Sequence, residues 1–436
     1  MRVLLLNPPG SRRYLRDYYC TTIAKSDYYY HPVDLLYLSG TLSSEHEVFA
    51  LDALARGLSV GAALAEISSC APDVVISLVA TPSFAEDQAF LASLKRLLPQ
   101  VRLIGTGDVF RELREEAFQL MPDLEASLVD FSTDDILRYL RGAPGAPIEN
   151  IIYRQGTGLF AGPERHGRGS FSIPLPRLSL FPDDLYSFPF VRQMPFMTVL
   201  SDFGCPYACA FCPVGTLGFK LRPVAEVLRE IMQLWQAGCR EVHFRDQTFG
   251  VQKERTLELC RAIEKGFPQL TWSCFSRVDV MDAERAAAMK SSGCHTVIFG
   301  IEFDDDKMHQ AVGKNIRRSQ MFDAVRICRA QGLQVVGTFL LGLPEHDEAA
   351  VARAGRLACD LDLDFASFNL AAPRPGTSLR RTWTPPRLAP ERLDFLRRAV
   401  ERRFYLRPSY IMKKISRIRS FAQLRVFLKN SVSLFF

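Results

Sequence analysis

The sequence contains two series in which strand-like and helix-like segments alternate. This alternation constrains the fold more than any other feature. The first series fills residues 1–142, where apolar runs such as RVLLLN and DVVISLVA are separated by helical periods. The second begins at Phe196 and repeats the strand-helix unit six times, up to FASFNLA. Such alternation with short loops is typical of parallel sheets covered by helices and joined by right-handed crossovers. We therefore expect an α/β protein, with a flavodoxin-like or Rossmann-like domain followed by a partial (β/α)6 barrel.

The pattern divides the 436 residues into four expected segments. The length of the chain alone suggests two or three domains, and two of the four segments are expected to be folded domains. Residues 1–142 form the Rossmann-like domain and residues 191–380 the barrel. Residues 143–190 are rich in Pro and Gly and poor in periodicity, which predicts a linker. Residues 381–436 form a basic, helical C-terminal extension.

Charge and hydropathy limit the expected cellular location of the protein and the kinds of partner that it can bind. Only four consecutive apolar residues precede Asn7, which is too short for a signal sequence, and no stretch approaches the roughly 18 apolar residues of a membrane span. We therefore expect a cytoplasmic protein. Nine Lys and Arg fall in residues 402–436, which hold no acid, so residues 1–401 carry −3 of the total net charge of +6. This mildly acidic body argues against nucleic-acid binding.

Three cysteines lie close together after the first strand of the second series. The segment GCPYACAFC places Cys205, Cys209 and Cys212 in a C-x3-C-x2-C spacing. In a reducing compartment such clustering indicates a metal site, and three thiolates can hold three irons of a cubane cluster with the fourth iron open. A structural zinc site needs a fourth ligand, and the next His downstream is His243, so iron-sulfur is favoured. The other cysteines are expected to be buried thiols: Cys20, Cys70, Cys239, Cys260, Cys274, Cys294, Cys328 and Cys359.

The triplet resembles the signature of the radical S-adenosylmethionine (SAM) superfamily, which has this spacing and an aromatic residue before the last cysteine, here Phe211. The resemblance extends over residues 196–376 and implies a 4Fe–4S cluster with SAM on the open iron. It also implies an enzyme that cleaves SAM reductively to functionalise an unactivated carbon. A reductant such as flavodoxin or ferredoxin would supply the electron.

Later strand ends resemble the SAM-contacting segments of the family in the same order. EVHFRDQTF is similar to the segment that reaches the methionyl amino group, and LTWSCFSRVD to the one near the ribose and carboxylate. GIE resembles the fourth-strand motif, and GTFLLGLP the glycine segment that packs on adenine. The family then continues with Gly-Glu, whereas this chain has Glu345-His346-Asp347. Besides Phe211, the resemblance assigns to SAM the residues Asp246, Gln247, Ser276, Arg277, Glu302, Gly337 and Gly342.

A flavodoxin-like domain before such a barrel resembles the cobalamin-binding subclass, over most of residues 1–142. In an open parallel sheet a planar cofactor lies at the carboxyl ends of the strands. The residues there are Ser77, Thr81, Ser83, Gly105 and Gly107. The chain lacks the Asp-x-His-x-x-Gly motif that ligates cobalt in many cobalamin domains. The resemblance therefore implies either cobalamin bound without a histidine ligand or a domain that has lost the cofactor.

An insertion between Pro9 and Pro32 holds six of the thirteen tyrosines. A loop this long in a compact domain is usually functional, and its aromatic content argues against disorder. Two hypotheses follow for its core, residues 14–30: it closes over cobalamin or substrate, or it docks the two domains together.

The C-terminal extension interleaves basic and apolar residues. Ile411, Ile415 and Ile418 share one helical face, with Lys414 and Arg417 turned away from it. A basic amphipathic helix favours contact with the inner face of a membrane or with a lipid-like substrate. The alternative is a helix that packs on the barrel with a solvated basic face.

The favoured reaction is cobalamin-dependent methylation of an unactivated carbon in a small-molecule or lipid-like substrate, with the catalytic residues unassigned. The alternative is a radical cyclisation, oxidation or rearrangement without methyl transfer. A methylthiolating RNA-modifying enzyme would need another N-terminal cysteine triad, and only Cys20 and Cys70 precede the barrel. A non-catalytic SAM- or cobalamin-sensing module is a further alternative, against which the intact triplet argues. Fold and cofactors do not identify the substrate.

Overall fold

The computed structural model describes residues 1–436 except 17–20, 26–27, 143–146, 165–167 and 416–436. The chain forms two compact units. The first contains Met1–Pro206, Pro213–Gln247 and Gln269–Thr271, and the second contains Tyr207–Cys212, Thr248–Pro268 and Trp272–Phe436.

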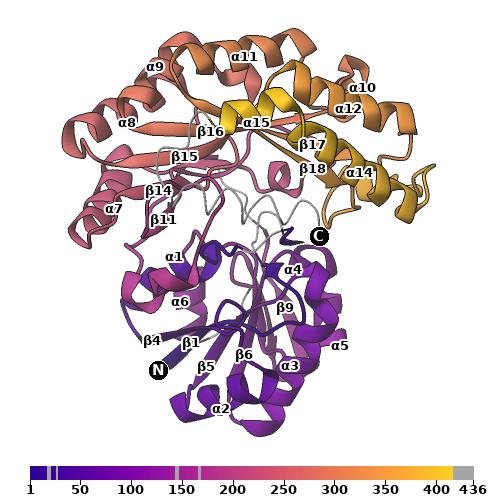
Figure 1. The fold of residues 1–436 in the computed structure, drawn as a ribbon. Helices are drawn as coiled ribbons and strands as arrows, with labels where there is room; N and C mark the ends of the chain where they lie inside the picture. Colours follow the sequence, from indigo (N-terminus) through magenta and orange to yellow (C-terminus); the bar gives the residue numbers. More distant parts are fainter. Residues whose placement is uncertain (17–20, 26–27, 143–146, 165–167, 416–436) are drawn as a thin grey trace. The chain divides into compact units, whose positions relative to one another are not determined.

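A seven-stranded sheet forms the centre of the first unit (Figure 1), in the order β4-β1-β5-β6-β7-β8-β9. The strands from β4 to β7 pair in parallel. The strands in chain order are β1 (Arg2–Asn7), β4 (Glu47–Asp52), β5 (Val74–Leu78), β6 (Arg102–Thr106), β7 (Ala126–Leu128), β8 (Ile151–Gln155) and β9 (Gly158–Ala161). The helices between them are α1 (Val33–Leu42), α2 (Val60–Cys70), α3 (Phe84–Leu97), α4 (Val109–Leu113), α5 (Ala117–Leu120) and α6 (Asp135–Leu140). Every residue of β5 is buried, as in a parallel sheet covered on both faces.

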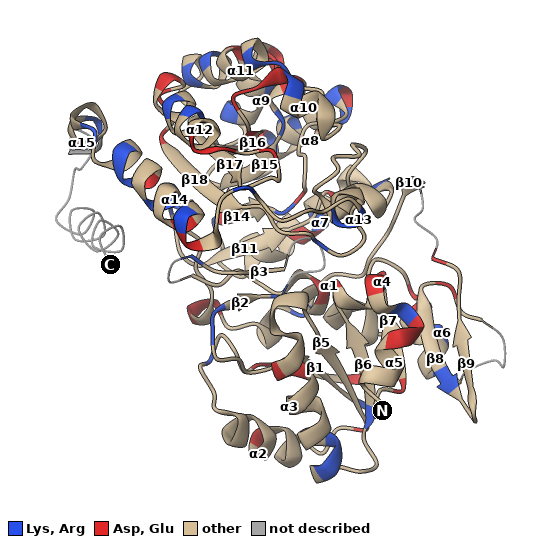
Figure 2. Cartoon of the chain, turned by 90° about the vertical axis from the view of Figure 1, so that its right-hand side faces the viewer, with Lys and Arg blue, Asp and Glu red and all other residues tan. Residues whose placement is uncertain are grey.

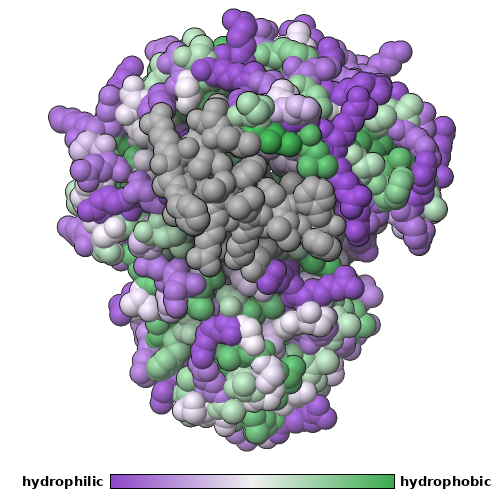
Figure 3. All heavy atoms as spheres, viewed as in Figure 1, coloured by the Kyte–Doolittle hydropathy of each residue, from purple (hydrophilic) through white to green (hydrophobic). Residues whose placement is uncertain are grey.

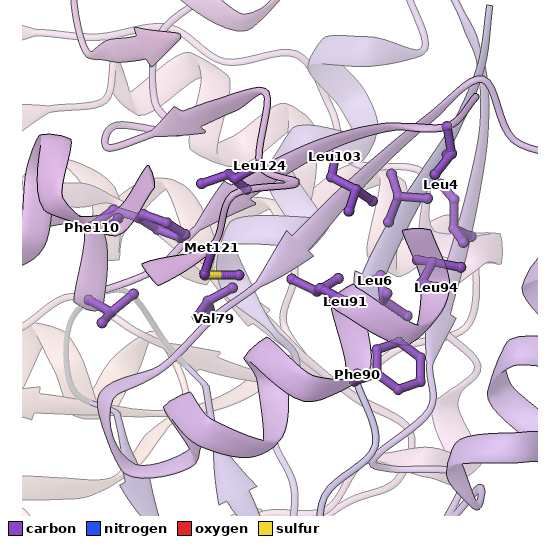
Figure 4. Packing of buried hydrophobic residues seen from close by; sticks show 14 of the residues in the cluster. Leu4, Leu6, Val79, Phe90, Leu91, Leu94, Leu103, Phe110, Met121 and Leu124 are labelled. Atoms are coloured by element: carbon purple, nitrogen blue, oxygen red, sulfur yellow. The ribbon is translucent and has the colours of Figure 1, made fainter. Parts of the chain in front are cut away.

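Apolar residues of the strands and of the crossover helices pack together in the first unit (Figure 4). Leu4 and Leu6 come from β1, Leu103 from β6, and Phe90 and Leu94 from α3. Each such side chain stabilises the fold by about 1.5–3 kcal/mol when fully buried. This core fixes the carboxyl ends of the strands, where the polar residues of the first series lie.

Part of the expected linker belongs to this sheet. Within residues 143–190, strands β8 and β9 form an antiparallel hairpin, and β8 pairs antiparallel with β7. Ile151, Ile152 and Tyr153 of β8 are buried. The structure therefore differs from the sequence-based expectation for residues 151–161, because these buried side chains give the sheet two further strands.

The first unit also holds the start of the second strand-helix series. Strand β11 (Phe196–Val199) pairs in parallel with β14 (Glu241–Phe244), and α7 (Val224–Gln236) connects them. A small sheet in the order β10-β13-β12 precedes and follows the cysteine loop. Its strands are β10 (Arg168–Ser170), β12 (Asp202–Gly204) and β13 (Phe219–Leu221).

The second unit continues the series with four parallel strands and their helices. The strands are β15 (Thr271–Ser276), β16 (Cys294–Glu302), β17 (Gln334–Leu341) and β18 (Phe365–Leu370). The helices are α8 (Lys253–Gly266), α9 (Ala283–Ser291), α10 (Asp306–Ala311), α11 (Arg318–Ala330), α12 (Glu348–Asp360) and α13 (Ser378–Arg381). Acidic and basic residues are mixed over these helices (Figure 2), and hydrophilic side chains make up most of the surface over α8, α9 and α11 (Figure 3). The helices thus bury one face against the strands and expose a polar one.

The described part of the C-terminal extension packs on the second unit. Helix α14 (Pro390–Tyr405) is followed by α15 (Pro408–Ile415). The Tyr410 ring lies 5.5 Å from the Phe404 ring, and Lys413 Nζ lies 3.1 Å from Asp362 Oδ2. These contacts support packing for residues up to 413. The remaining basic residues, and Ile418 with them, lie outside the described residues, and no helix that the structure describes is long and apolar enough to cross a membrane.

The described parts of the tyrosine-rich insertion dock on the first unit. Strands β2 (Tyr14–Leu15) and β3 (Thr22–Ile23) form a small hairpin. Arg16 between them is buried and pairs with Asp87 of α3 at 2.6 Å. Further along, the Tyr30 ring lies 5.0 Å from the Arg245 guanidinium. Internal packing therefore accounts for the described insertion residues, while a role toward a ligand stays a prediction.

Candidate active site

The three clustered cysteines lie on one half-buried loop after β12. The backbone N–H of Cys205 donates to the carbonyl of Gly218 at 2.9 Å, and that of Cys212 donates to the carbonyl of Cys209 at 3.0 Å. Gly204 starts the loop with a φ of +83°, and a Cβ there would lie 2.1 Å from the carbonyl oxygen of Gly218. Only glycine fits this turn.

This donor set is compatible with an iron-sulfur cluster. Among the described residues, no three His, Cys, Asp or Glu side chains lie close enough to hold a single metal ion. Three thiolates that bind three different irons of a cubane need not meet at one point. Three thiols on one half-buried loop therefore fit the cluster, and their role as ligands stays a prediction. Of the other cysteines, Cys239, Cys260, Cys274, Cys294 and Cys328 are buried as expected, Cys70 and Cys359 are only half-buried, and Cys20 lies outside the described residues.

Phe211, the aromatic residue of the signature, packs within the second unit. Its ring meets the Phe303 ring edge-on at 6.4 Å between centroids. Phe303 belongs to a small apolar cluster with Val312 and Leu343, against which Phe211 packs. This contact anchors the end of the cysteine loop.

Arg277 contacts the cysteine loop as well. Its Nη1 atom lies 3.6 Å from Cys209 Sγ, and its guanidinium carbon lies 3.8 Å from the centre of the Tyr207 ring. Burial alone would lower the pKa of Arg277, but the neighbouring Asp279 carboxylate raises this pKa above its ordinary value. The guanidinium therefore stays charged beside the thiol, a contact that the assignment to SAM did not include.

Glu302 ends β16 in a strained conformation and forms a buried ion pair. Its φ is +65°, where the register between β16 and β17 shifts. Lys314 Nζ lies 2.9 Å from Glu302 Oε1, and a Cβ on Gly300 would lie 2.6 Å from that Nζ atom. Backbone strain held in place by an ion pair is typical of functional sites. The sequence analysis missed Lys314, since an isolated lysine carries no spacing signal.

A cavity of about 140 Å³ opens at the carboxyl ends of β16 and β17. Glu302, Phe303, Leu340, Leu341 and His346 are among the residues that line it. These strand ends are the two that the sequence resemblance assigns to the fourth-strand and adenine segments. Most of the lining is polar, because Asp304, Asp305, Glu345, Asp347 and Arg353 also line the cavity beside the apolar side chains.

The departure from the family at residues 345–347 has a structural role. The backbone N–H of Gly342, whose φ is +81°, donates to His346 Nδ1 at 3.1 Å. Burial lowers the pKa of His346, so the ring stays neutral and can accept this bond. Asp347 caps α12 by accepting a hydrogen bond from the N–H of Ala350 at 2.7 Å. A Cβ on Gly337 would lie 2.5 Å from a methyl group of Leu363, so packing also explains that glycine.

Three other residues assigned to SAM differ in the hydrogen-bond partners of their side chains. Both oxygens of Asp246 accept hydrogen bonds from Ser201, at 2.7 Å from its N–H and 2.5 Å from its hydroxyl. Ser276 Oγ donates to the carbonyl of Phe249 at 2.8 Å. In contrast, the buried Nε2 of Gln247 has no hydrogen-bond partner among the described residues. Gln247 is therefore the one of these three whose side-chain donor is left for a ligand.

The polar residues assigned to cobalamin form hydrogen bonds within the first unit. Thr81 Oγ1 donates to Asp108 at 2.9 Å, Ser83 Oγ donates to Asp87 at 2.7 Å, and Ser77 Oγ donates to the carbonyl of Leu78 at 3.1 Å.

Tight packing explains the two glycines assigned to cobalamin. A Cβ would lie 2.1 Å from the Phe110 ring at Gly105 and 2.1 Å from the Val79 carbonyl oxygen at Gly107.

Two other buried hydroxyls belong to neighbouring strands of this sheet. Thr106 ends β6, and Ser127 lies on the neighbouring β7. Thr106 Oγ1 and Ser127 Oγ are buried without a hydrogen-bond partner among the described residues. The register pairs Ser127 with Gly105, so the side chains of Ser127 and Thr106 lie on opposite faces of the sheet. Buried polar groups are rarely left unpaired, and only Thr106 stands at a strand end, so its hydroxyl is a candidate contact for a ligand there. Thr106 lies between Gly105 and Gly107, in the strand-end segment that the resemblance assigns to cobalamin, whereas Ser127 in the middle of β7 carries no such signal.

Comparison with known proteins identifies the second strand-helix series. Residues 202–358 match the sequence profile of the radical SAM superfamily. These residues are a radical SAM domain. An uncharacterized methyltransferase of Pyrococcus horikoshii is 29% identical, over 95% of this chain and 95% of its own length.

Two solved structures share the fold over both strand-helix series. The radical SAM methyltransferase TsrM from Kitasatospora setae, with cobalamin and a 4Fe–4S cluster bound, gives a TM-score of 0.67 at 19% identity. That match covers 87% of this chain and 76% of TsrM. The cobalamin-dependent SAM radical enzyme OxsB, with aqua-cobalamin and SAM bound, gives a TM-score of 0.66 at 15% identity, over 82% of this chain and 51% of OxsB.

These findings confirm the predicted superfamily and the predicted fold class, a Rossmann-like sheet domain followed by a radical SAM barrel. They also confirm the prediction of a radical SAM enzyme, whose family implies a 4Fe–4S cluster and SAM. The individual residues assigned to the cluster, SAM and cobalamin are not tested by a likeness of this kind and stay predictions.

Proposed function

We propose that this chain is a cobalamin-dependent radical SAM methyltransferase that methylates an unactivated carbon. The observation that carries the proposal is the shared fold: one chain combines a Rossmann-like sheet domain with a radical SAM domain, and 87% of it matches TsrM. When bound, the cluster and SAM supply a hydrogen-abstracting radical, and cobalamin supplies the methyl group. The chain itself binds, orients and shields these groups.

In this proposal Cys205, Cys209 and Cys212 hold three irons and leave the fourth for SAM. Gln247 offers SAM an unsatisfied donor. The hydroxyl of Thr106 donates to cobalamin at the carboxyl edge of the first sheet.

The proposed substrate is a small molecule or a lipid-like molecule, with the electron drawn from a flavodoxin or ferredoxin. We place the enzyme in the cytoplasm, with contact to the inner membrane face if residues 416–436 add to the basic surface. No nucleic acid is expected to bind, because residues 1–401 carry a net negative charge.

The ratio of two products tests the reaction type. Recharging cobalamin with a methyl group turns one SAM into S-adenosylhomocysteine, while radical formation turns a second into 5′-deoxyadenosine. A methyltransferase should release both in about equal amounts per turnover and transfer a deuterated methyl group from labelled SAM to a compound in cell extract. Cys209→Ala should lose the cluster absorbance and both products, whereas Cys274→Ala, a buried thiol in β15, should keep them.

One observation favours a second candidate, a radical reaction without methyl transfer. OxsB, a cobalamin-dependent SAM radical enzyme that is not named a methyltransferase, matches the fold about as well as TsrM does. A large excess of 5′-deoxyadenosine with no labelled methyl group in any product would decide for this candidate.

A further inference from the structure

Arg277 is a buried cation whose position is fixed by three partners. It follows β15, and only 5% of its surface is exposed. Its Nε and Nη2 atoms bind the two oxygens of Asp279 at 3.0 and 2.9 Å. Nη2 also donates to the carbonyl of Lys314 at 2.7 Å. These bonds direct the remaining nitrogen, Nη1, toward Cys209 Sγ at 3.6 Å.

The loop segment that carries Cys209 is held by the same part of the second unit. The N–H of Ala210 donates to the carbonyl of Val312 at 2.8 Å, and the N–H of Leu379 donates to the carbonyl of Ala210 at 2.9 Å. The carbonyl of Lys314, two residues after Val312, receives the bond from Arg277. The segment 312–314 therefore positions both the thiol and the guanidinium.

We propose that Arg277 is a positioning residue for the cluster, which donates a charge-assisted hydrogen bond to the Cys209 thiolate and raises the reduction potential of the cluster. This inference rests on the proposed function, because it requires Cys209 to bind iron. Reduction adds a negative charge to the cluster, and a hydrogen bond to a ligand sulfur stabilises the more negative state. A desolvated guanidinium makes this effect large, since burial limits screening by water.

A redox titration of the reconstituted full-length protein, followed by electron paramagnetic resonance, tests the inference. Arg277→Gln should lower the midpoint potential of the cluster. At the wild-type midpoint, the ratio of reduced to oxidised cluster should then fall about tenfold, which corresponds to a shift of about 59 mV for one electron. Asp279→Asn should shift the ratio the other way, because the guanidinium then loses its counter-charge. Opposite shifts distinguish an electrostatic role from general disturbance of the site.

Arg285→Gln is the matched control, since the Arg285 guanidinium pairs with the carboxylate of Asp282, the N-cap residue of α9 in the same unit. It should leave the midpoint and the spectrum unchanged. If Arg277→Gln holds a full cluster with the wild-type midpoint and spectrum, the inference is overturned. If Arg277→Gln holds no cluster, Arg277→Lys decides: a recovered cluster supports the role of the cation, and no recovery in a folded protein overturns it.

The two proposals can fail separately. A wild-type chain that binds no cluster refutes the proposed function and this inference together. A wild-type chain that binds a cluster and cleaves SAM, while its potential ignores both Arg277→Gln and Asp279→Asn, refutes the inference alone.

Discussion

The buried imidazole of His31 should make the folded chain less stable in mild acid. This residue is 0% exposed, and its ring lies 4.2 Å from the Tyr186 ring and 5.2 Å from the Phe196 ring. Its Nδ1 atom lies 3.2 Å from Thr198 Oγ1, and its Nε2 atom has no hydrogen-bond partner among the described residues. Burial lowers the pKa of His31 from 6.5 to about 3, because an imidazolium at this place loses its hydration.

The size of the effect follows from the two pKa values. The unfolded chain protonates this imidazole near pH 6.5, whereas the folded chain does so only near pH 3. Between these values the unfolded state binds more protons, so the stability contribution is fully present above pH 6.5 and is lost as the pH falls toward 3. Moving from about pH 7.5 to about pH 5.0 should therefore cost about 2 kcal/mol of unfolding free energy from this group.

Urea unfolding of wild type and His31→Gln at both pH values measures this contribution. Gln keeps a polar partner for Thr198 but does not titrate, so its stability deficit at pH 7.5 should shrink by about 2 kcal/mol at pH 5.0. Phe196→Leu, which removes ring packing without removing a titrating group, should lose the same free energy at both pH values. A His31→Gln deficit that is equal at both pH values would refute the reasoning.

Two further substitutions test the packing of the first unit. Glu230→Ala should lower the unfolding free energy by about 3–5 kcal/mol, because it leaves the fully buried Arg222 without the carboxylate that lies 2.5 Å away. A loss below about 1 kcal/mol in urea unfolding would contradict this prediction. Gly107→Ala should destabilise by about 2 kcal/mol more than Gly142→Ala, because both glycines have positive φ but only Gly107 would place a Cβ 2.1 Å from the Val79 carbonyl oxygen. Equal melting temperatures for the two glycine variants would show that the contact is not tight.

The strand-helix alternation predicted most of the fold because local periodicity carries it. The sequence pattern placed a helix at Lys253–Lys265, and the structure has one at Lys253–Gly266. The same agreement holds at Ala283–Ser291, where Asp282 caps the helix by accepting a hydrogen bond from the N–H of Arg285 at 2.8 Å. Each such helix has a clear apolar face and a polar one, so the pattern is readable without tertiary information.

The hairpin of β8 and β9 could not be recognised in the same way. Its sequence, IIYRQGTGLFA, lies inside a segment rich in Pro and Gly, which predicts loops. What makes it a strand pair is the edge of a sheet: β8 pairs with β7, and Tyr153 is fully buried. Pairing with a strand more than twenty residues earlier is a tertiary contact that a local pattern does not encode.

For the site, spacing predicted the positions of the residues but not the bonds of their side chains. The cysteine triplet and Phe211 lie on one loop, as the spacing requires. The contact between Arg277 and Cys209 joins residues 68 positions apart and depends on the direction of both side chains. Asp246 likewise sits at the expected strand end, yet it bonds the backbone of Ser201.

This difference gives a criterion for choosing between residues that a family pattern assigns to a ligand. A side chain whose polar atoms are already bonded gains little from a ligand, whereas a buried donor without a partner costs about 1–3 kcal/mol until a ligand satisfies it. By this criterion Gln247 is a stronger candidate for SAM than Asp246, and Thr106 is a stronger candidate for cobalamin than Ser83, whose hydroxyl is bonded. We therefore expect substitutions of the bonded residues to affect stability and substitutions of the unbonded residues to affect ligand affinity.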